Sequence, residues 1–179
     1  MTYAIKAPAR YAQGAGELAN LGRSAKKLGN KFLVICTDNS RGRFGAQVEA
    51  SLAEQEKEVV FTTFHGEATK DEVFAKMDEC RAQGCDVVVG MGGGKALDTA
   101  KAVAENLGLP CVIIPTVASN DAPCSGVAVL YNDAGVVVRA FWRASEYSPT
   151  LQHKHGVALS IPLSADNIPV PMPLLQTKE

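Results

Sequence analysis

A run of glycines followed by a lysine is the stretch of this sequence with the clearest chemical meaning. The residues are Gly90-Met91-Gly92-Gly93-Gly94-Lys95, between an apolar run and a helical pattern. Consecutive glycines let the backbone approach a diphosphate closely, and a helix N-terminus offers unpaired N–H groups to its negative charge. A tight turn without a ligand is the alternative, but such a turn needs a single glycine. We therefore interpret this run as a phosphate-binding turn.

The spacing of the run excludes two common phosphate motifs. A Walker A loop requires the pattern G-x4-G-K-[ST]. Val89 stands where its first glycine belongs, and Ala96 replaces the hydroxyl residue that would hold magnesium. The dinucleotide fingerprint G-x-G-x-x-G also fails, because Lys95 occupies its third glycine position. The turn is therefore of a third type.

A second polar stretch follows another apolar run, over residues 115–125. It places hydroxyls, an amide and a carboxylate in one loop, with the sequence Pro-Thr-Val-Ala-Ser-Asn-Asp-Ala-Pro-Cys-Ser. Short polar groups of this kind can bind a nucleotide or a polyol. The alternative is a surface loop in which Ser, Thr and Asn satisfy their own backbone.

Two acidic residues have positions that suggest a role. Asp38 follows the first buried strand pattern, where a carboxylate can accept hydrogen bonds from a ribose and repel a 2′-phosphate. This favours NAD over NADP, although a local Asx-turn is an equal alternative. Asp98 lies one turn into the helix after the glycines, as a solvated residue or as a partner of Lys101.

The elements that must position these groups alternate along the chain. Apolar runs predict buried strands at residues 31–36, 59–63, 86–91 and 111–114. Helical periodicity separates them, with a further helix at 18–28 and a polar loop at 37–43, and Gly84 and Gly108 are expected to end helices. We expect a small entry hairpin from 3–5 and 10–13 and another hairpin from strands at 127–131 and 136–139. The order predicts an α/β, doubly wound domain with a mainly parallel, Rossmann-like sheet. In such a sheet the polar segments after the strands meet at one edge, where ligands bind.

Composition narrows the function classes. The net charge is −1, which favours neither nucleic acid nor an anionic membrane as partner. The five cysteines show no CxxC spacing, so we expect reduced thiols and a cytoplasmic protein. After Ala140 the helical period is lost and five prolines occur, so we expect a domain over 1–140 and a poorly structured tail over 141–179.

Three stretches together resemble a known family. Residues 92–101 match the GGGKxxDxAK signature of the metal-dependent polyol dehydrogenases, which are relatives of dehydroquinate synthase. The 115–125 loop and the Tyr11-Ala12-Gln13-Gly14 stretch are similar to those of the glycerol dehydrogenases. The resemblance covers about residues 1–140 and implies an NAD-binding domain.

The resemblance also implies roles for single residues. Asp121 matches a position that contacts glycerol, and the ribose-binding acid falls at Thr37, with Asp38 one residue later as its substitute. The positions that match contacts to NAD are Gly93, Gly94, Lys95, Asp98, Thr116, Ser119, Ser125, Val127 and Tyr131.

In the resembling family an aspartate and two histidines hold a catalytic zinc in a helical C-terminal domain. No segment after Ala140 is similar to that domain, so no metal ligand and no catalytic residue is assigned. We expect the NAD-binding half of a polyol oxidoreductase, inactive alone, with a small polyol as substrate and a homo-oligomer as a possible assembly. The alternatives are a stand-alone nucleotide-binding fragment and another enzyme of this superfamily, such as a glycerol-1-phosphate dehydrogenase or a synthase.

Overall fold

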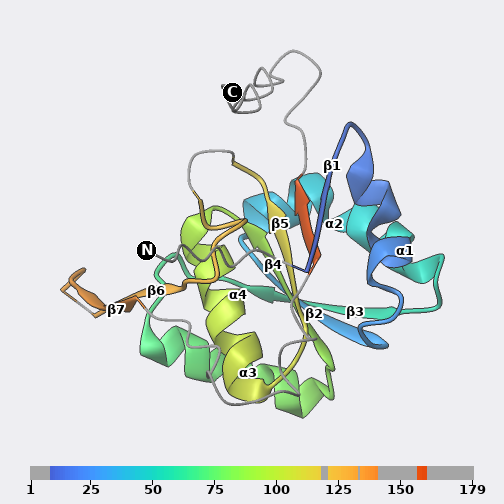
Figure 1. Ribbon diagram of the computed structural model, residues 1–179. Helices are drawn as coiled ribbons and strands as arrows, with labels where there is room; N and C mark the ends of the chain where they lie inside the picture. Colours follow the sequence, from blue (N-terminus) through green and yellow to red (C-terminus); the bar gives the residue numbers. More distant parts are fainter. Residues whose placement is uncertain (1–8, 118–120, 133, 141–156, 161–179) are drawn as a thin grey trace, which may run out of the picture.

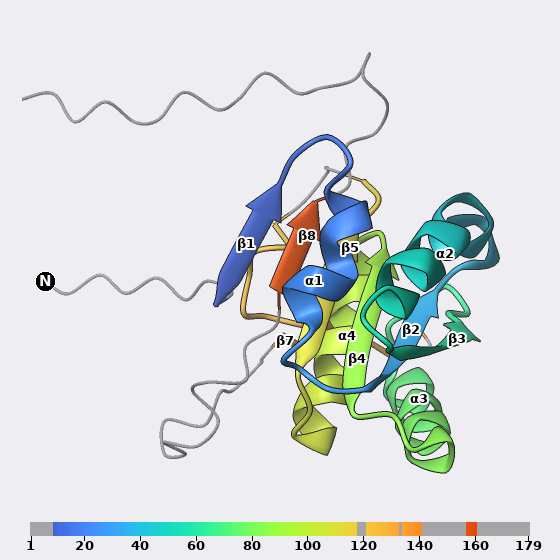
Figure 2. The same cartoon turned by 90° about the vertical axis from the view of Figure 1, so that its right-hand side faces the viewer.

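The computed structural model describes residues 9–117, 121–132, 134–140 and 157–160. A six-stranded parallel sheet runs through the molecule in the order β1-β8-β5-β4-β2-β3 (Figures 1 and 2). A separate antiparallel pair, β6 and β7, projects from the domain in Figure 1. The strands are β1 (Arg10–Gln13), β2 (Lys31–Cys36), β3 (Glu58–Thr63), β4 (Val87–Gly92), β5 (Cys111–Pro115), β6 (Val129–Tyr131), β7 (Val137–Ala140) and β8 (Val157–Ser160). The helices are the 3-10 helix η1 (Glu17–Asn20) and the α-helices α1 (Leu21–Ala25), α2 (Asp38–Ala53), α3 (Lys70–Gln83) and α4 (Gly94–Leu107).

The sheet is covered on both faces, which confirms the α/β doubly wound prediction. Alternate residues of each central strand point to opposite sides. Leu33 and Val88 belong to the apolar core under α3 and α4, whereas Phe32 and Val34 belong to the core under α1 and α2. Continuous apolar strands are therefore required, because neither face of β2, β4 or β5 meets solvent.

Helix ends follow their sequence signals. Gly84 and Gly108 adopt left-handed conformations, with φ of 66° and 64°, at the C-terminal ends of α3 and α4. Thr69 caps α3 by accepting a hydrogen bond from the backbone N–H of Glu72. The Glu72 side chain does not complete the reciprocal cap, because its carboxylate accepts from the backbone N–H of His65.

The helix predicted at 18–28 is divided in two. Its first turn is η1, and α1 begins at Leu21. The cause is a tertiary contact: the Ser51 hydroxyl of α2 donates to the Ala19 carbonyl at 2.7 Å and accepts from the Gly22 N–H at 3.0 Å. These backbone groups bond to α2 instead of continuing a single regular helix.

The polar segment 37–43 was expected as a loop, and this expectation is wrong. Helix α2 begins at Asp38, because the Thr37 side chain accepts a hydrogen bond from the Ser40 N–H at 3.2 Å and caps the helix. An acid in the first turn also complements the helix dipole. The residues of this first turn are polar, so they show no apolar periodicity that would predict a helix.

Two strands at the edge of the sheet depend on distant pairing. Residues 10–13, expected in a small entry hairpin, pair in parallel with β8. Strand β8 also pairs with β5 and lies past the boundary expected at residue 140, so the sheet extends beyond that boundary. The other expected hairpin strand, 3–5, and the rest of 141–179 lie outside the described residues.

All five cysteines of the chain are described, and none forms a disulfide. Cys36, Cys80, Cys85 and Cys111 are buried, and Cys124 is exposed. Burial raises the pKa of the Cys111 thiol to about 12 and that of Cys36 and Cys80 to about 11. These three thiols are therefore poor nucleophiles near neutral pH.

No helix within the described part of the chain is long and apolar enough to cross a membrane.

Helix α4 and strand β4 approach closely at one glycine, which gives a stability prediction. A Cβ at Gly90 would lie 2.7 Å from Ala100 Cβ and 3.3 Å from Leu97 Cα. Gly90→Ala should therefore lower the free energy of unfolding by about 1–3 kcal/mol, measured by urea denaturation. Gly42→Ala in α2 is the matched control, because no atom of the described residues lies within 4 Å of the Cβ that alanine would add. This substitution should raise the free energy of unfolding by about 0.5–1 kcal/mol. Equal effects of the two substitutions would contradict this account.

Candidate functional site

A crevice is expected where neighbouring parallel strands send the chain to opposite faces of the sheet. Strands β2 and β4 are hydrogen-bonded neighbours. The chain leaves β2 into α2, whose residues Val48 and Leu52 pack in one core. It leaves β4 into α4, whose residues Leu97 and Ala100 pack in the other. The carboxyl ends of β2 and β4 therefore flank a topological switch point, the usual ligand-binding position of an open α/β sheet.

The glycine run lies at this switch point, and its glycines have different roles. Gly90 and Gly92 make room for α4, since a Cβ on Gly92 would lie 3.1 Å from Ala96 Cβ. Gly93 has an ordinary φ of −83°, and no atom of the described residues lies within 4 Å of the position that a Cβ would take there. Contacts within the described residues therefore do not explain why Gly93 lacks a side chain. Open space at the end of β4 is what a ligand's phosphate would require.

Among the described residues, no side chain caps the N-terminus of α4. Thr37 and Thr69 cap α2 and α3, but the N-cap of α4 is Gly93. The first N–H groups of a helix have no partner within it. They are available at α4 for an anion, and half-exposed Gly93 and Gly94 give access to them.

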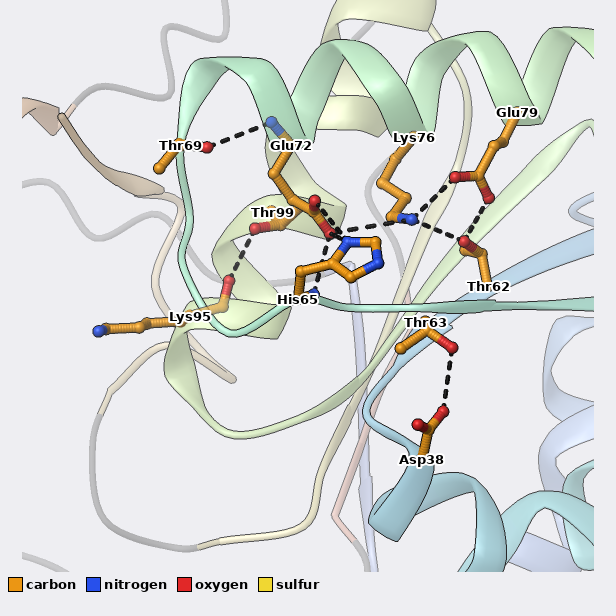
Figure 3. Close-up of polar contacts among 10 residues, drawn as sticks. All are labelled: Asp38, Thr62, Thr63, His65, Thr69, Glu72, Lys76, Glu79, Lys95 and Thr99. Atoms are coloured by element: carbon orange, nitrogen blue, oxygen red, sulfur yellow. Dashed lines mark hydrogen bonds and ion pairs between the residues drawn. The ribbon is translucent and has the colours of Figure 1, made fainter. Parts of the chain in front are cut away.

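Asp38 is the acidic group at the carboxyl end of β2. It is exposed, and its Oδ1 accepts a hydrogen bond from the Thr63 hydroxyl of β3 at 3.0 Å (Figure 3). Thr37, the alternative position, has its side-chain oxygen engaged with the N–H and the hydroxyl of Ser40. The second carboxylate oxygen of Asp38 therefore has no hydrogen-bond partner among the described residues, whereas Thr37 acts as a helix cap.

Lys95 is exposed and already has an anionic partner. Its Nζ lies 2.6 and 2.7 Å from the two carboxylate oxygens of Glu67, in the loop between β3 and α3. The same ammonium lies 5.3 Å from the centroid of the Tyr131 ring. The Tyr131 N–H donates to the Ala68 carbonyl at 2.8 Å, so β6 lies beside this loop. Glu67 was not recognised in the sequence, because its relation to the glycine run is not local.

Asp98 is buried, so it is not the solvated helix residue considered from the sequence. Its Oδ1 accepts from Lys101 Nζ at 3.1 Å, and its Oδ2 accepts from the Val129 N–H at 3.1 Å. Burial raises the pKa of the Asp98 carboxyl, and the Lys101 ammonium and the Val129 N–H only partly offset this. The structure therefore favours the sequence alternative in which Asp98 is the partner of Lys101.

Lys101 joins this pair to the segment after β5. Its Nζ donates to the Val127 carbonyl at 2.8 Å and contacts the Ser125 hydroxyl at 3.4 Å. Lys101 is itself buried. We call residues 121–131 the strap, because they pass along α4 to the N-terminus of α3. Lys101 belongs to the sequence motif at 92–101. Its spacing of three residues from Asp98 indicated the ion pair, but no feature of the sequence indicated its contact with the strap.

The remaining predicted residues divide between the strap and the end of β5. Thr116 is buried, and its N–H donates to the Gly92 carbonyl at 3.0 Å, next to the glycine turn. Asp121 is exposed at the start of the strap, and its carbonyl accepts from the N–H groups of Cys124 and Ser125. Ser119 lies outside the described residues.

A second buried lysine lies on α3, near the same edge. Lys76 Nζ lies 2.8 Å from the Thr62 hydroxyl and 2.8 Å from Glu79 Oε1, and Thr62 and Glu79 are also hydrogen-bonded (Figure 3). Although burial acts to raise the pKa of the Glu79 carboxyl, hydrogen bonds from Lys76 and Thr62 hold it below its usual value. The partners of Lys76 come from α3 and β3, so this cluster joins α3 to the edge strand.

The described residues do not provide a metal site. Among 9–117, 121–132, 134–140 and 157–160, no group of three or more His, Cys, Asp or Glu side chains is placed to hold a metal ion. A catalytic zinc takes three protein ligands. No catalytic step through a metal is therefore derived from these residues.

Comparison with known proteins agrees with this geometry. Residues 8–151 match the family described as iron-containing alcohol dehydrogenase. The chain is 40% identical over 135 residues to a glycerol dehydrogenase of Pseudomonas putida, covering 75% of this chain and 37% of that protein. It is 38% identical over 135 residues to a glycolaldehyde reductase of Halobacterium salinarum, with the same coverage of both proteins.

A solved structure shows the same relation. The probable glycerol dehydrogenase from Sinorhizobium meliloti superimposes with a TM-score of 0.74 and 31% identity, covering 89% of this chain and 41% of that one. The chain thus spans little more than a third of the length of the curated relatives it matches. Because the family match extends over most of the sequence, this chain belongs to the iron-containing alcohol dehydrogenase family.

Proposed function

We propose that this chain binds NAD for a polyol dehydrogenase of its family. The observation that carries the proposal is the N-terminus of α4, whose N-cap residue Gly93 has no side chain and which begins at the switch point between β2 and β4. The diphosphate would lie at Gly93, Gly94 and Lys95, and the adenosine ribose at Asp38. Calorimetric titration of the purified chain with NAD tests this directly, and no detectable binding would refute it.

The strap and the end of β5 would form the rest of the cofactor site. Thr116 adjoins the glycine turn through Gly92, and Tyr131 lies beside Lys95. These contacts support the proposal that Thr116 and Tyr131 lie near the cofactor. The resemblance to the glycerol dehydrogenases adds Ser119, Ser125 and Val127. Asp98 acts on this site through the strap, since both of its carboxylate oxygens have protein partners.

The proposed reaction of the whole enzyme is oxidation of a small polyol such as glycerol. NAD, when bound, would accept a hydride from the carbinol carbon while the hydroxyl proton passes to solvent, which would give the carbonyl product and NADH. Glycerol dehydrogenases of Pseudomonas putida and Escherichia coli support this class of substrate. Asp121 would accept a hydrogen bond from a substrate hydroxyl. A carboxylate there favours a neutral polyol over a polyol phosphate, because like charges repel.

A metal that acidifies the substrate hydroxyl is expected in the whole enzyme, as zinc or iron. Its ligands would lie in the part of the longer relatives that this chain does not match. The 179-residue chain should therefore bind NAD but form no NADH with glycerol and added zinc or iron. The measurement is NADH absorbance with enzyme free of host dehydrogenases. Metal-dependent turnover abolished by Asp121→Ala would show that a complete active site is present.

Gly93→Ser should separate helix stability from nucleotide binding. A serine at this N-cap satisfies N–H groups of α4, so the protein should be more stable by a few tenths of a kcal/mol. The same hydroxyl would occupy the N–H groups and the open space proposed for the diphosphate. We expect the affinity for NAD to fall about tenfold, equivalent to about 1.4 kcal/mol. Unchanged affinity in a folded variant would place the diphosphate elsewhere.

Asp38 should make the chain prefer NAD to NADP. A carboxylate about 4 Å from a second negative charge raises the energy by about 1 kcal/mol even in water, or roughly fivefold in affinity. Asp38→Asn should therefore lower the ratio of the dissociation constant for NADP to that for NAD by roughly fivefold. Asp71→Asn is the matched control, since it removes an exposed acid from the first turn of α3. If both variants change the ratio equally, net charge and not Asp38 sets the preference.

A further inference from the structure

A buried ion pair on α4 contacts the segment that carries most of the proposed cofactor residues. Asp98 and Lys101 have 8% and 6% of their surfaces exposed. Together they bond to three residues of the strap: the Val127 carbonyl, the Val129 N–H and the Ser125 hydroxyl. The pair therefore faces the strap.

The charged groups of the pair are already occupied. An ammonium has three donors, and Lys101 Nζ has Asp98, Val127 and Ser125 within 3.4 Å. Both carboxylate oxygens of Asp98 accept from protein groups. Every donor of Lys101 Nζ and each Asp98 oxygen thus has a partner among the described residues, so we infer that an effect of the pair on binding passes through the strap.

The apolar residues by which the strap reaches the core are mostly small. Ala122 and Ala128 are buried, and the partly buried Leu130 packs against the same core. At its far end, the Tyr131 N–H bonds to the Ala68 carbonyl. The Val127 carbonyl accepts a hydrogen bond from the buried Lys101, so it points toward α4. The Val127 side chain is 39% exposed in this orientation of the backbone. Buried charged pairs can select one arrangement in this way, because an apolar contact would tolerate several.

We propose that Lys101, neutralised by Asp98, is a positioning residue that holds the strap in the conformation that binds the cofactor. This inference rests on the proposed NAD site. It assigns to Lys101 the placement of Ser125 and Val127, and it makes Asp98 the partner that keeps the buried ammonium charged and oriented.

The decisive variants separate positioning from stability. Lys101→Met removes the ammonium and leaves Asp98 unpaired, so it should both destabilise the protein and release the strap. The double variant Asp98→Leu/Lys101→Met removes both charges, and replacing a buried pair by apolar residues is often neutral for stability. The double variant should therefore melt close to the wild-type temperature and still bind NAD about tenfold more weakly. Lys101→Arg, which keeps a charged donor, should restore part of the affinity.

Lys76→Met is the matched control. Lys76 is also buried and paired at i,i+3 with Glu79, but its partners belong to α3 and β3. It should lower the melting temperature as Lys101→Met does, while the folded protein binds NAD with unchanged affinity. Equal losses of affinity in Lys76→Met and Lys101→Met would overturn the proposal.

Cys124 provides a readout that does not depend on the cofactor. It lies in the strap and is exposed, whereas the other four cysteines are buried. Its rate of reaction with a thiol reagent should rise several-fold in the double variant and stay unchanged in Lys76→Met. In the wild type NAD should slow the reaction, and in the double variant this protection should be lost.

The outcomes distinguish the two proposals. If the wild type binds no NAD, the proposed function fails, and a faster Cys124 reaction in the double variant would still show that the pair holds the strap. If the wild type binds NAD and the double variant matches it in affinity and Cys124 reactivity, the proposed function stands and the role of Lys101 is refuted.

Discussion

The close packing of α4 against β4 is the contact on which the rest of this structure depends. Gly90 lacks a side chain where Ala100 crosses it, and Gly92 lies against Ala96 in the same way. Helix and strand approach so closely that only Gly93 separates the end of β4 from the start of α4. The positive end of the helix dipole is thus brought to the carboxyl edge of the sheet, beside the switch point formed with β2.

The same helix organises the second wall of the site through a buried charge pair. Helices α3 and α4 each carry a buried lysine paired with an acid at i,i+3, Lys76 with Glu79 and Lys101 with Asp98. Lys76 completes its hydrogen bonds with Thr62 of the neighbouring strand, whereas Lys101 does so with the strap. Two pairs with the same spacing therefore act differently: one fixes a helix to the sheet, and the other fixes a binding segment to a helix.

Several features could be predicted from the sequence because their causes are local. Apolar runs located β2, β3, β4 and β5, and Gly84 and Gly108 marked helix ends because a left-handed residue is needed there. The start of α2 was missed, since Thr37 caps it through a single hydrogen bond within a polar segment. Strand β8 was missed because four residues become a strand only by pairing with β1 and β5.

The sequence by itself determined the α/β alternation and placed the glycine turn, Asp38 and the 115–125 loop at one edge of the sheet, because periodicity and chain order suffice for both. Only the tertiary structure decided where individual side chains point. Lys95 lies against Glu67, 28 residues earlier, and Lys101 bonds to Val127, 26 residues later. A charged side chain takes the direction in which its charge is best neutralised, and here the neutralising partners are brought near only by the packing of α4 between the strap and the sheet.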